Sequence, residues 1–322
     1  MKKILITLAA VIAMITASQA QQLPLYSQYM MNGFLLNPAM AGSVDYIPLR
    51  ITARQQWVGI TDAPATYAIS GHSKIGDAMG VGGYIFTDMF GPIQRTGAQG
   101  SYAYHLKLGS ETKLGLGLSL SAFQYSLDES QLDLLEEGDN AVTYGTETVF
   151  VPDANFGAYL YGEKYFAGLA AQQLVQFKIQ LGDNGQNSNQ IVRHYFITGG
   201  YTFDLGEKFQ LQPSLLLKGT ERSPFQVDIN LKAIYQKNYW LGVSFRTQDA
   251  VIAMLGVKVD KYMIGYAFDY TLSNIINYSS GSHEIMIGIN IGEGKDSGSS
   301  LLYKIKKPLK SGFFILLIPF NN

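Results

Sequence analysis

Four histidines are the residues of this chain best suited to acid–base or metal chemistry: His72, His105, His194 and His283. No two of them stand at a metal-ligand spacing such as His-x-x-x-His, and the chain contains no cysteine, so the usual zinc donor sets are missing. A serine hydrolase needs a histidine within hydrogen-bond reach of both the serine and an orienting carboxylate or amide. Whether these histidines can serve such a centre depends on the elements that carry them.

A run of acidic residues is the other candidate for chemistry, because carboxylates bind divalent cations. The run lacks the ordered carboxylate spacing and the central glycine of a calcium loop, so it favours a solvated acidic surface over a metal site. We therefore predict no metal site and no cofactor. The acidic residues are Asp128, Glu129, Asp133, Glu136, Glu137 and Asp139.

The elements that position the four histidines are β-strands, and the acidic run lies in a connection between two of them. Apolar and polar residues alternate with a period of two between residues 49 and 291, as they do from Leu114 to Leu120. Each run is about 9–12 residues long, which is the length a tilted strand needs to cross a bilayer. We predict about fourteen strands, at 49–58, 65–75, 79–88, 94–108, 112–127, 151–161, 164–175, 190–204, 208–219, 224–236, 238–246, 249–259, 261–272 and 281–291.

The connections between these runs alternate in length. Every other connection is a tight turn of hairpin type, at 76–77, 109–111, 162–163, 206–207, 237 and 260. The intervening connections are mostly longer, near 59–64, 89–93, 128–150, 176–189, 220–223, 247–248 and 273–280. Short periplasmic turns, longer external loops and an even number of strands are typical of bacterial outer-membrane barrels. The predicted fold is therefore an all-β, transmembrane antiparallel outer-membrane β-barrel whose first strand rises from the periplasm.

Composition excludes several other classes of protein. The formal net charge is −1 and charged residues make up 15% of the chain, so nothing indicates nucleic-acid binding. After the first twenty residues no apolar run reaches about 18 residues, the minimum for a transmembrane helix. Residues 1–20 have a short basic start, an apolar stretch and Ser18-Gln19-Ala20, which together predict a secretory signal peptide cleaved before Gln21.

Two segments are expected to lie outside the barrel wall. Residues 21–48 have apolar residues at roughly helical spacing, ended by Asn37-Pro38. They are interpreted either as an amphipathic segment packed under or inside the barrel or as a periplasmic docking element. Residues 292–322 begin as a flexible linker and end in a basic and then apolar stretch too short to cross a bilayer as a helix. Their role stays open.

The polar strand faces are expected to line the lumen and to make it net basic. The residues counted are Arg50, Arg54, Lys74, Lys107, Lys113, Lys218, Lys232 and Arg246 against Asp228, Asp269 and Glu284. Two interpretations remain: lysines that mark the periplasmic interface, or a lumen that attracts anions or acidic segments. The same alternation places His72, His105 and His194 on the lumen face of distant strands. A lipid-facing hydrolase centre is therefore not predicted.

Three stretches carry a resemblance to a known family. They are Leu25 to Ser43, Arg54 to Ile75, and Ser280 or Gly281 to Ile291. Their order and spacing, over about 21–291, resemble the PorP/SprF family of type IX secretion system membrane proteins. The matching positions are Tyr26-Ser27-Gln28-Tyr29, Asn37-Pro38-Ala39, Ala41-Gly42, Arg54-Gln55-Gln56-Trp57 and Ser282-His283-Glu284-Ile285.

The resemblance implies a non-enzymatic outer-membrane component of a type IX secretion and gliding apparatus. Such a protein would work in outer-membrane lipid, with a secreted surface protein as client and periplasmic components of the machine as partners. It would support export or surface anchoring of large proteins. The alternative is an outer-membrane porin or substrate channel with a basic lumen. A third hypothesis, an outer-membrane hydrolase, rests only on isolated histidine and serine residues.

Two of the family-like stretches are predicted to meet where the barrel closes. Closure pairs the first strand with the last, which would bring Arg54, Gln56 and Trp57 beside His283 and Glu284. Alternation places Arg54, Gln56 and Glu284 on the lumen face and Trp57 on the outer face. We expect this seam to set the closure register, with a partner-binding role as a second possibility. Tyr26, Gln28, Tyr29, Asn37, Pro38 and Gly42 are the candidate docking residues of the N-terminal segment.

Overall fold

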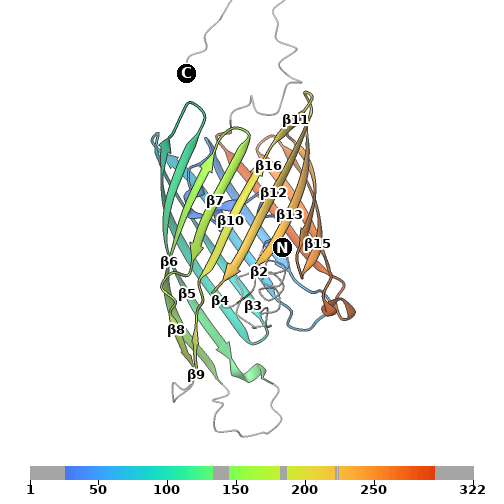
Figure 1. The fold of residues 1–322 in the computed structure, drawn as a ribbon. Coiled ribbons are helices and arrows are strands. Elements are labelled where there is room, and N and C mark those ends of the chain that lie inside the picture. The colour runs from blue at the N-terminus through green and yellow to red at the C-terminus, as the bar shows by residue number, and fades with distance from the viewer. Residues whose placement is uncertain (1–25, 133–144, 182–186, 222, 224, 294–322) are drawn as a thin grey trace, which may run out of the picture.

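The computed structural model describes residues 26–132, 145–181, 187–221, 223 and 225–293 (Figure 1). The predicted signal peptide, most of the acidic run and the tail from residue 294 onward lie outside these residues. Strands dominate the described part, and they form one closed antiparallel barrel of fourteen strands. The predicted fold class is confirmed.

Fourteen strands make up the wall once β10 and β11, which are interrupted at Thr202, are taken as one. The wall strands are β1 (Ile47–Gln55), β2 (Ala65–Ile75), β3 (Met79–Phe90), β4 (Ile93–Lys107), β5 (Lys113–Asp128), β6 (Thr146–Tyr161), β7 (Tyr165–Gln172), β10 (His194–Tyr201), β11 (Phe203–Leu205), β12 (Phe209–Thr220), β13 (Gln226–Tyr235), β14 (Tyr239–Arg246), β15 (Ala250–Val259), β16 (Tyr262–Thr271) and β17 (Ser282–Ile291).

Neighbouring strands pair in chain order, and the wall closes by the pairing of β1 with β17. The wall is continuous across the loop that follows β7, because β10 pairs with both β7 and β12. A closed wall leaves no unpaired strand edge, which matters in a bilayer because lipid cannot hydrogen-bond to exposed backbone groups.

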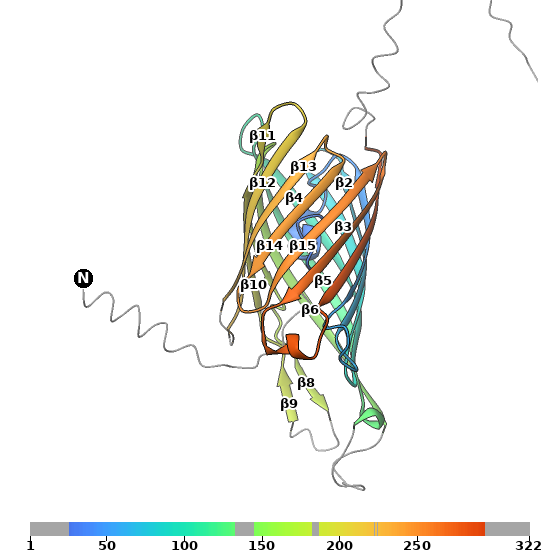
Figure 2. The ribbon, with the colours of Figure 1, turned by 90° about the vertical axis from the view of Figure 1, so that its right-hand side faces the viewer.

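The connections at one end are tight, as in the turn after β2, and those at the other end are mostly longer. We call these the short-turn end and the long-loop end. The long-loop end has one feature that the alternation did not predict. In the predicted loop 176–189 and at the first residue of the predicted strand after it, β8 (Lys178–Leu181) and β9 (Asn187–Gln190) form a separate two-stranded sheet. This hairpin extends beyond the barrel wall (Figures 1 and 2). Ile179 anchors it by packing with Phe123, Tyr125 and Val151 of the wall.

The two faces of the wall differ as the alternation predicts. Along β14, exposed and buried residues strictly alternate, and the exposed ones include Leu241 and Val243. Buried positions on the inner face are largely polar, for example Arg246 and Ser244. An apolar outer face against a polar inner face is the arrangement that a lipid-embedded barrel requires.

The inner space is occupied by the chain itself. Residues 26–43, here called the lumen segment, contain the short 3₁₀ helices η1 (Gly33–Leu35) and η2 (Pro38–Met40) and lie inside the wall (Figure 2). Two more 3₁₀ helices, η3 (Glu129–Gln131) and η4 (Asn274–Asn277), lie in long-loop connections. Among the described residues no helix has the length and apolar character needed to cross a membrane.

Candidate functional site: the barrel seam and the lumen segment

The seam is the junction of β1 and β17, and the two family-like stretches meet there. In the antiparallel register Arg54 lies opposite Glu284 and Gln55 lies opposite His283. Arg54 and Glu284 are both buried on the lumen side, with side-chain exposures of 2% and 0%. Their closest charged atoms, Arg54 Nη1 and Glu284 Oε2, are 3.5 Å apart. The seam therefore carries a buried ion pair near the long-loop end.

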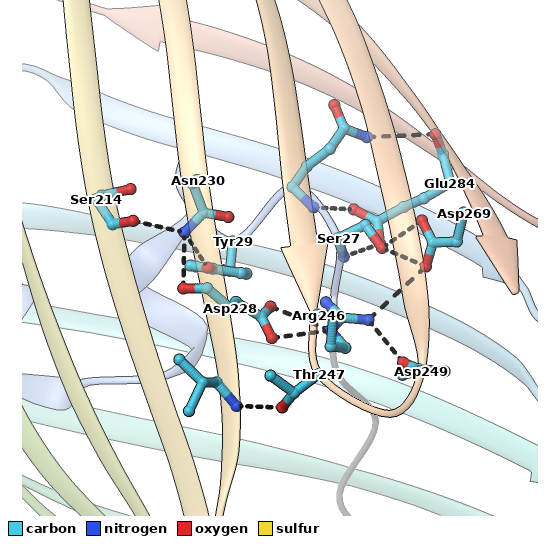
Figure 3. A network of polar contacts seen from close by, with 12 residues as sticks. Ser27, Tyr29, Ser214, Asp228, Asn230, Arg246, Thr247, Asp249, Asp269 and Glu284 are labelled. Atoms are coloured by element: carbon cyan, nitrogen blue, oxygen red, sulfur yellow. Dashed lines mark hydrogen bonds and ion pairs between the residues drawn. The ribbon is translucent and has the colours of Figure 1, made fainter. Parts of the chain in front are cut away.

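This pair belongs to a larger ionic network that spans several strands, and Figure 3 shows its part around Glu284, Asp269 and Arg246. Arg54 Nη2 lies 2.7 Å from Asp269 Oδ2 on β16. Asp269 also lies 3.8 Å from Arg246 of β14, whose Nε donates to both carboxylate oxygens of Asp228 at 3.1 and 3.0 Å. Two arginines thus alternate with three buried carboxylates around this part of the inner wall.

The lumen segment enters this network directly. Glu284 accepts hydrogen bonds from the backbone N–H groups of Ser27, at 2.6 Å, and Gln28, at 2.9 Å. The Ser27 hydroxyl donates to Asp269 at 2.8 Å, and Arg54 Nη1 donates to the same hydroxyl at 2.6 Å. Gln28 Nε2 adds a bond to the Glu284 carbonyl oxygen. Ser27 therefore connects the seam to the segment through both its backbone and its side chain.

The network holds the closed, filled barrel in one arrangement, because an arginine removed from it would leave buried carboxylates without their charged partner. Such a loss costs about 3–5 kcal/mol in soluble proteins, whereas the intact pair contributes little net stability against an apolar replacement. The arrangement therefore contributes more to structural specificity than to stability. It selects one register for β1 against β17 and one position for the start of the lumen segment. A slip of one residue would turn Arg54 and Glu284 toward lipid.

The middle of the segment is held by an asparagine and by close backbone approach. Asn37 Nδ2 donates to the carbonyl oxygens of Ala158 and Leu169, while its Oδ1 accepts from the backbone N–H of Ala39. The facing position on β6 is Gly157, where any Cβ would collide with the Asn37 side chain. The wall is therefore shaped to admit this turn.

The far end of the segment reaches the short-turn end, where two of the histidines bind its backbone. The backbone N–H of Gly42 donates to His72 Nδ1 at 3.1 Å, and His105 Nε2 lies 2.7 Å from the Ala41 carbonyl oxygen. His194, on β10, contacts Gln173 and the Val192 carbonyl. These three lumen histidines therefore have structural partners. Among the described residues no group of three or more acidic or histidine side chains is arranged to hold a metal ion.

The six candidate docking residues of the N-terminal segment are all buried inside the barrel. Tyr26 packs with Leu35 and Ala68, and the Tyr29 hydroxyl accepts a hydrogen bond from Asn230. Burial leaves none of their side chains free to meet a periplasmic partner in this conformation. The structure thus matches the interpretation of a segment packed inside the barrel and gives no support to docking by these residues, which are Tyr26, Gln28, Tyr29, Asn37, Pro38 and Gly42.

Two seam positions differ from the strand prediction. β1 ends at Gln55, so Gln56 and Trp57 belong to the following turn and have no place on a lumen or outer strand face. Trp57 has a positive φ of 45°, which breaks the extended backbone although the apolar–polar alternation continues in the sequence. Its backbone N–H still reaches the seam by donating to Ser282 Oγ at 3.1 Å. His283 faces outward, where its ring contacts Phe268 and its Nδ1 lies 2.7 Å from the Tyr266 hydroxyl.

The fully buried charges of the wall strands include acidic side chains that the expectation of a basic lumen did not count. Six basic and five acidic side chains on the wall strands are buried, which is close to balance. The expectation omitted Asp88, Arg95 and Asp153, which alternation also places inside. The buried set is Arg50, Arg54, Arg95, Lys218, Lys232 and Arg246 against Asp88, Asp153, Asp228, Asp269 and Glu284.

Sequence reasoning missed Ser27, Asp228, Arg246 and Asp269 as members of the site. Alternation placed the two aspartates and the arginine on the polar face, and Ser27 stood within a family-like stretch. Asp228 and Arg246 are register partners on the paired strands β13 and β14, whereas Asp269 of β16 and Ser27 join them only across the curved inner wall and through the lumen segment.

Comparison with known proteins decides the family. The sequence model described as type IX secretion system membrane protein PorP/SprF matches residues 18–289. The chain belongs to the PorP/SprF family. No curated protein matches the sequence of this chain. The predicted resemblance is confirmed over most of the chain.

Solved structures similar to this PorP/SprF protein are membrane barrels of low sequence identity. The Ralstonia pickettii toluene transporter TbuX is 10% identical, with a TM-score of 0.48 over 80% of this chain and 92% of that chain. A Pseudomonas aeruginosa FadL homologue is 10% identical, with a TM-score of 0.45 over 85% and 95%. The KdgM porin is 9% identical, with a TM-score of 0.36 over 77% and 99%. These likenesses concern architecture only.

Proposed function

We propose that this protein is a non-enzymatic outer-membrane component of the type IX secretion and gliding apparatus. It supports export or surface anchoring of large secreted proteins by binding protein partners. Family membership is the first support. The observation that carries the proposal is the filled lumen, because a segment held at both ends and in the middle by buried polar contacts favours a docking platform over an open conduit.

The proposed orientation places the short-turn end in the periplasm and the long-loop end at the cell surface. The long-loop end offers a surface suited to a secreted client. There the outward positions of β4 to β6 change from apolar to polar, as at Gln94, Thr96, Gln124 and Thr148, which are all exposed. The β8–β9 hairpin projects from the same end. Periplasmic components of the machine would meet the tight turns at the opposite end.

The test is a deletion strain of the source bacterium. We expect one or a few large surface proteins to fail to reach the surface, while uptake of small molecules is unchanged. Surface proteins are quantified by protease shaving of intact cells followed by mass spectrometry. The control is the same strain complemented with the wild-type gene, which should restore display. Normal display of every large surface protein in the deletion strain would contradict the proposal.

The channel alternative is tested separately with purified barrel in planar bilayers. Under our proposal the wild-type protein is silent, whereas a variant lacking residues 26–43 conducts. Steady, anion-selective conductance of the wild-type protein would favour the channel. The hydrolase hypothesis predicts a turnover that disappears when His72, His105 and His194 are replaced together. We expect no turnover in the wild-type protein.

A further inference from the structure

A cavity of about 200 Å³ lies in the lumen between the lumen segment and strands β6, β7, β10, β12 and β13. It is separate from the seam network, and nothing in the proposed function uses it. Aromatic and aliphatic side chains form most of its lining, among them Tyr29, Tyr159, Phe166, Phe196 and Leu36. Lys232, Ser214 and Thr198 add polar groups to the same lining.

Lys232 is the unusual member of this lining. It is 5% exposed, and the hydrogen bond of its Nζ runs to the Met31 thioether sulfur at 3.5 Å. Its register partners on the neighbouring strands, Gln212 and Gly242, carry no charge. The buried arginines at 54, 95 and 246 each pair with a carboxylate. Within the described part of the chain Lys232 forms no such ion pair. A buried ammonium whose acceptor is a thioether lacks the anionic partner that normally offsets its loss of water.

Ser214, which lies near Lys232, is a second donor whose acceptor is a methionine sulfur. Its hydroxyl donates to the Met30 sulfur at 3.3 Å, and sulfur is a weak acceptor. Because Gln212 is the partner of Lys232 and Ser214 stands two residues further along β12, Ser214 and Lys232 are diagonal neighbours on the inner face. Such neighbours lie roughly 7–8 Å apart, so their side chains can meet at one ligand. Two donors whose acceptors, among the residues that the structure describes, are methionine sulfurs thus converge on one cavity.

We propose that this cavity binds a small organic anion, with its carboxylate on Lys232 and Ser214 and its apolar body among the aromatic rings. A volume of 200 Å³ corresponds to roughly seven water molecules at about 30 Å³ each, so the ligand is small. A monocarboxylate with one aromatic ring suits both the charge and the lining, since rings pack favourably against Tyr and Phe. The lumen segment forms one wall, so the bound anion also contacts Met30 and Leu36.

The test uses the full mature protein purified in detergent, with benzoate as the probe and benzamide as its neutral analogue. Isothermal titration calorimetry should show benzoate binding to the wild-type barrel, with benzamide at least tenfold weaker. Lys232→Met removes the charge with little change in shape and should weaken benzoate binding at least tenfold. Lys208→Met, at an exposed lysine in a short turn, is the matched control and should bind benzoate as the wild type does.

Folding of Lys232→Met is checked by the heat-dependent mobility shift of the barrel on gels. If that variant does not fold, Ser214→Ala and the benzoate-to-benzamide ratio of the wild-type protein decide the question. Absence of benzoate binding at millimolar concentration would overturn the proposal. Equal binding of benzoate and benzamide, or equal binding by the wild type and a folded Lys232→Met barrel, would overturn it too.

Discussion

Glu284→Gln is the substitution that most directly tests the role of the seam. The Glu284 carboxylate accepts two backbone hydrogen bonds from the lumen segment and pairs with Arg54. Glutamine has nearly the same shape but only one acceptor oxygen, and its NH₂ group would face a backbone N–H. One of the two segment amides would then lose its acceptor, and Arg54 would keep Asp269 as its charged partner.

The magnitude follows from the contacts that are lost. A hydrogen bond to a charged group contributes about 1.5–3 kcal/mol, and a buried donor left unsatisfied costs about 1–3 kcal/mol. Breaking one partner of a buried pair costs about 3–5 kcal/mol. Since Arg54 retains one carboxylate, we expect Glu284→Gln to weaken the binding of the lumen segment to the seam by about 3 kcal/mol. At 1.4 kcal/mol per factor of ten, local release of the segment becomes roughly a hundredfold more frequent.

Hydrogen–deuterium exchange measures this release directly. The peptide that contains Ser27 and Gln28 should exchange roughly a hundredfold faster in Glu284→Gln, consistent with the lost contacts. Exchange along the wall strands far from the seam should be unchanged. His283→Gln is the control, because His283 is adjacent on β17 and faces outward. Unchanged exchange at Ser27 and Gln28 in Glu284→Gln, or the same acceleration in His283→Gln, would refute the reasoning.

Three further predictions concern the middle of the segment, the ionic network and the lipid face. Gly157→Ala should lower the unfolding free energy by about 1–3 kcal/mol, because its Cβ would collide with the asparagine side chain of the lumen segment. Gly100→Ala, with open space around it, should leave thermal unfolding unchanged, and equal midpoints for the two variants would be inconsistent with this packing. Asp228→Asn removes one carboxylate from Arg246, which keeps Asp249 at 3.3 Å and Asp269 at 3.8 Å, and should lower the unfolding free energy in urea by about 1.5–3 kcal/mol; a loss below about 1 kcal/mol, the range of exposed pairs, would count against the network. Ile287→Arg places a charge in the middle of the lipid-facing side of β17 and should destabilise the barrel in vesicles by about 2–4 kcal/mol. Ile291→Arg, at the strand end, should cost about 1 kcal/mol or less, and a larger cost there would place the membrane elsewhere along the wall.

The wall of the barrel could be predicted almost completely from the sequence. Alternation is a local property, since successive side chains of a strand point to opposite faces whatever lies around them. It located the strands from β2 to β17 to within a few residues, apart from the starts of β6 and β10 and the end of β7. It also placed Arg54 and Glu284 on the lumen face. The closing pair of strands followed from barrel geometry, so the opposition of Arg54 and Glu284 could be predicted as well.

Alternation failed where the backbone stops being extended. Trp57 continues the apolar–polar pattern of β1, but its positive φ ends the strand, and the residue pattern alone carries no sign of that turn. The β8–β9 hairpin was missed for another reason, because each strand has only four residues, too short a run for alternation to stand out, and β9 is polar throughout.

Sequence by itself therefore determined the strands, the face of each wall residue and the order of pairing, because these depend on a two-residue period and on neighbours in the chain. Only the tertiary structure decided what fills the barrel. The lumen segment contacts β2, β6, β13, β16 and β17, whose inner faces converge only after closure. The link from Ser27 to Glu284, and the cavity around Lys232, arise from distances across the lumen, and no local pattern encodes those distances.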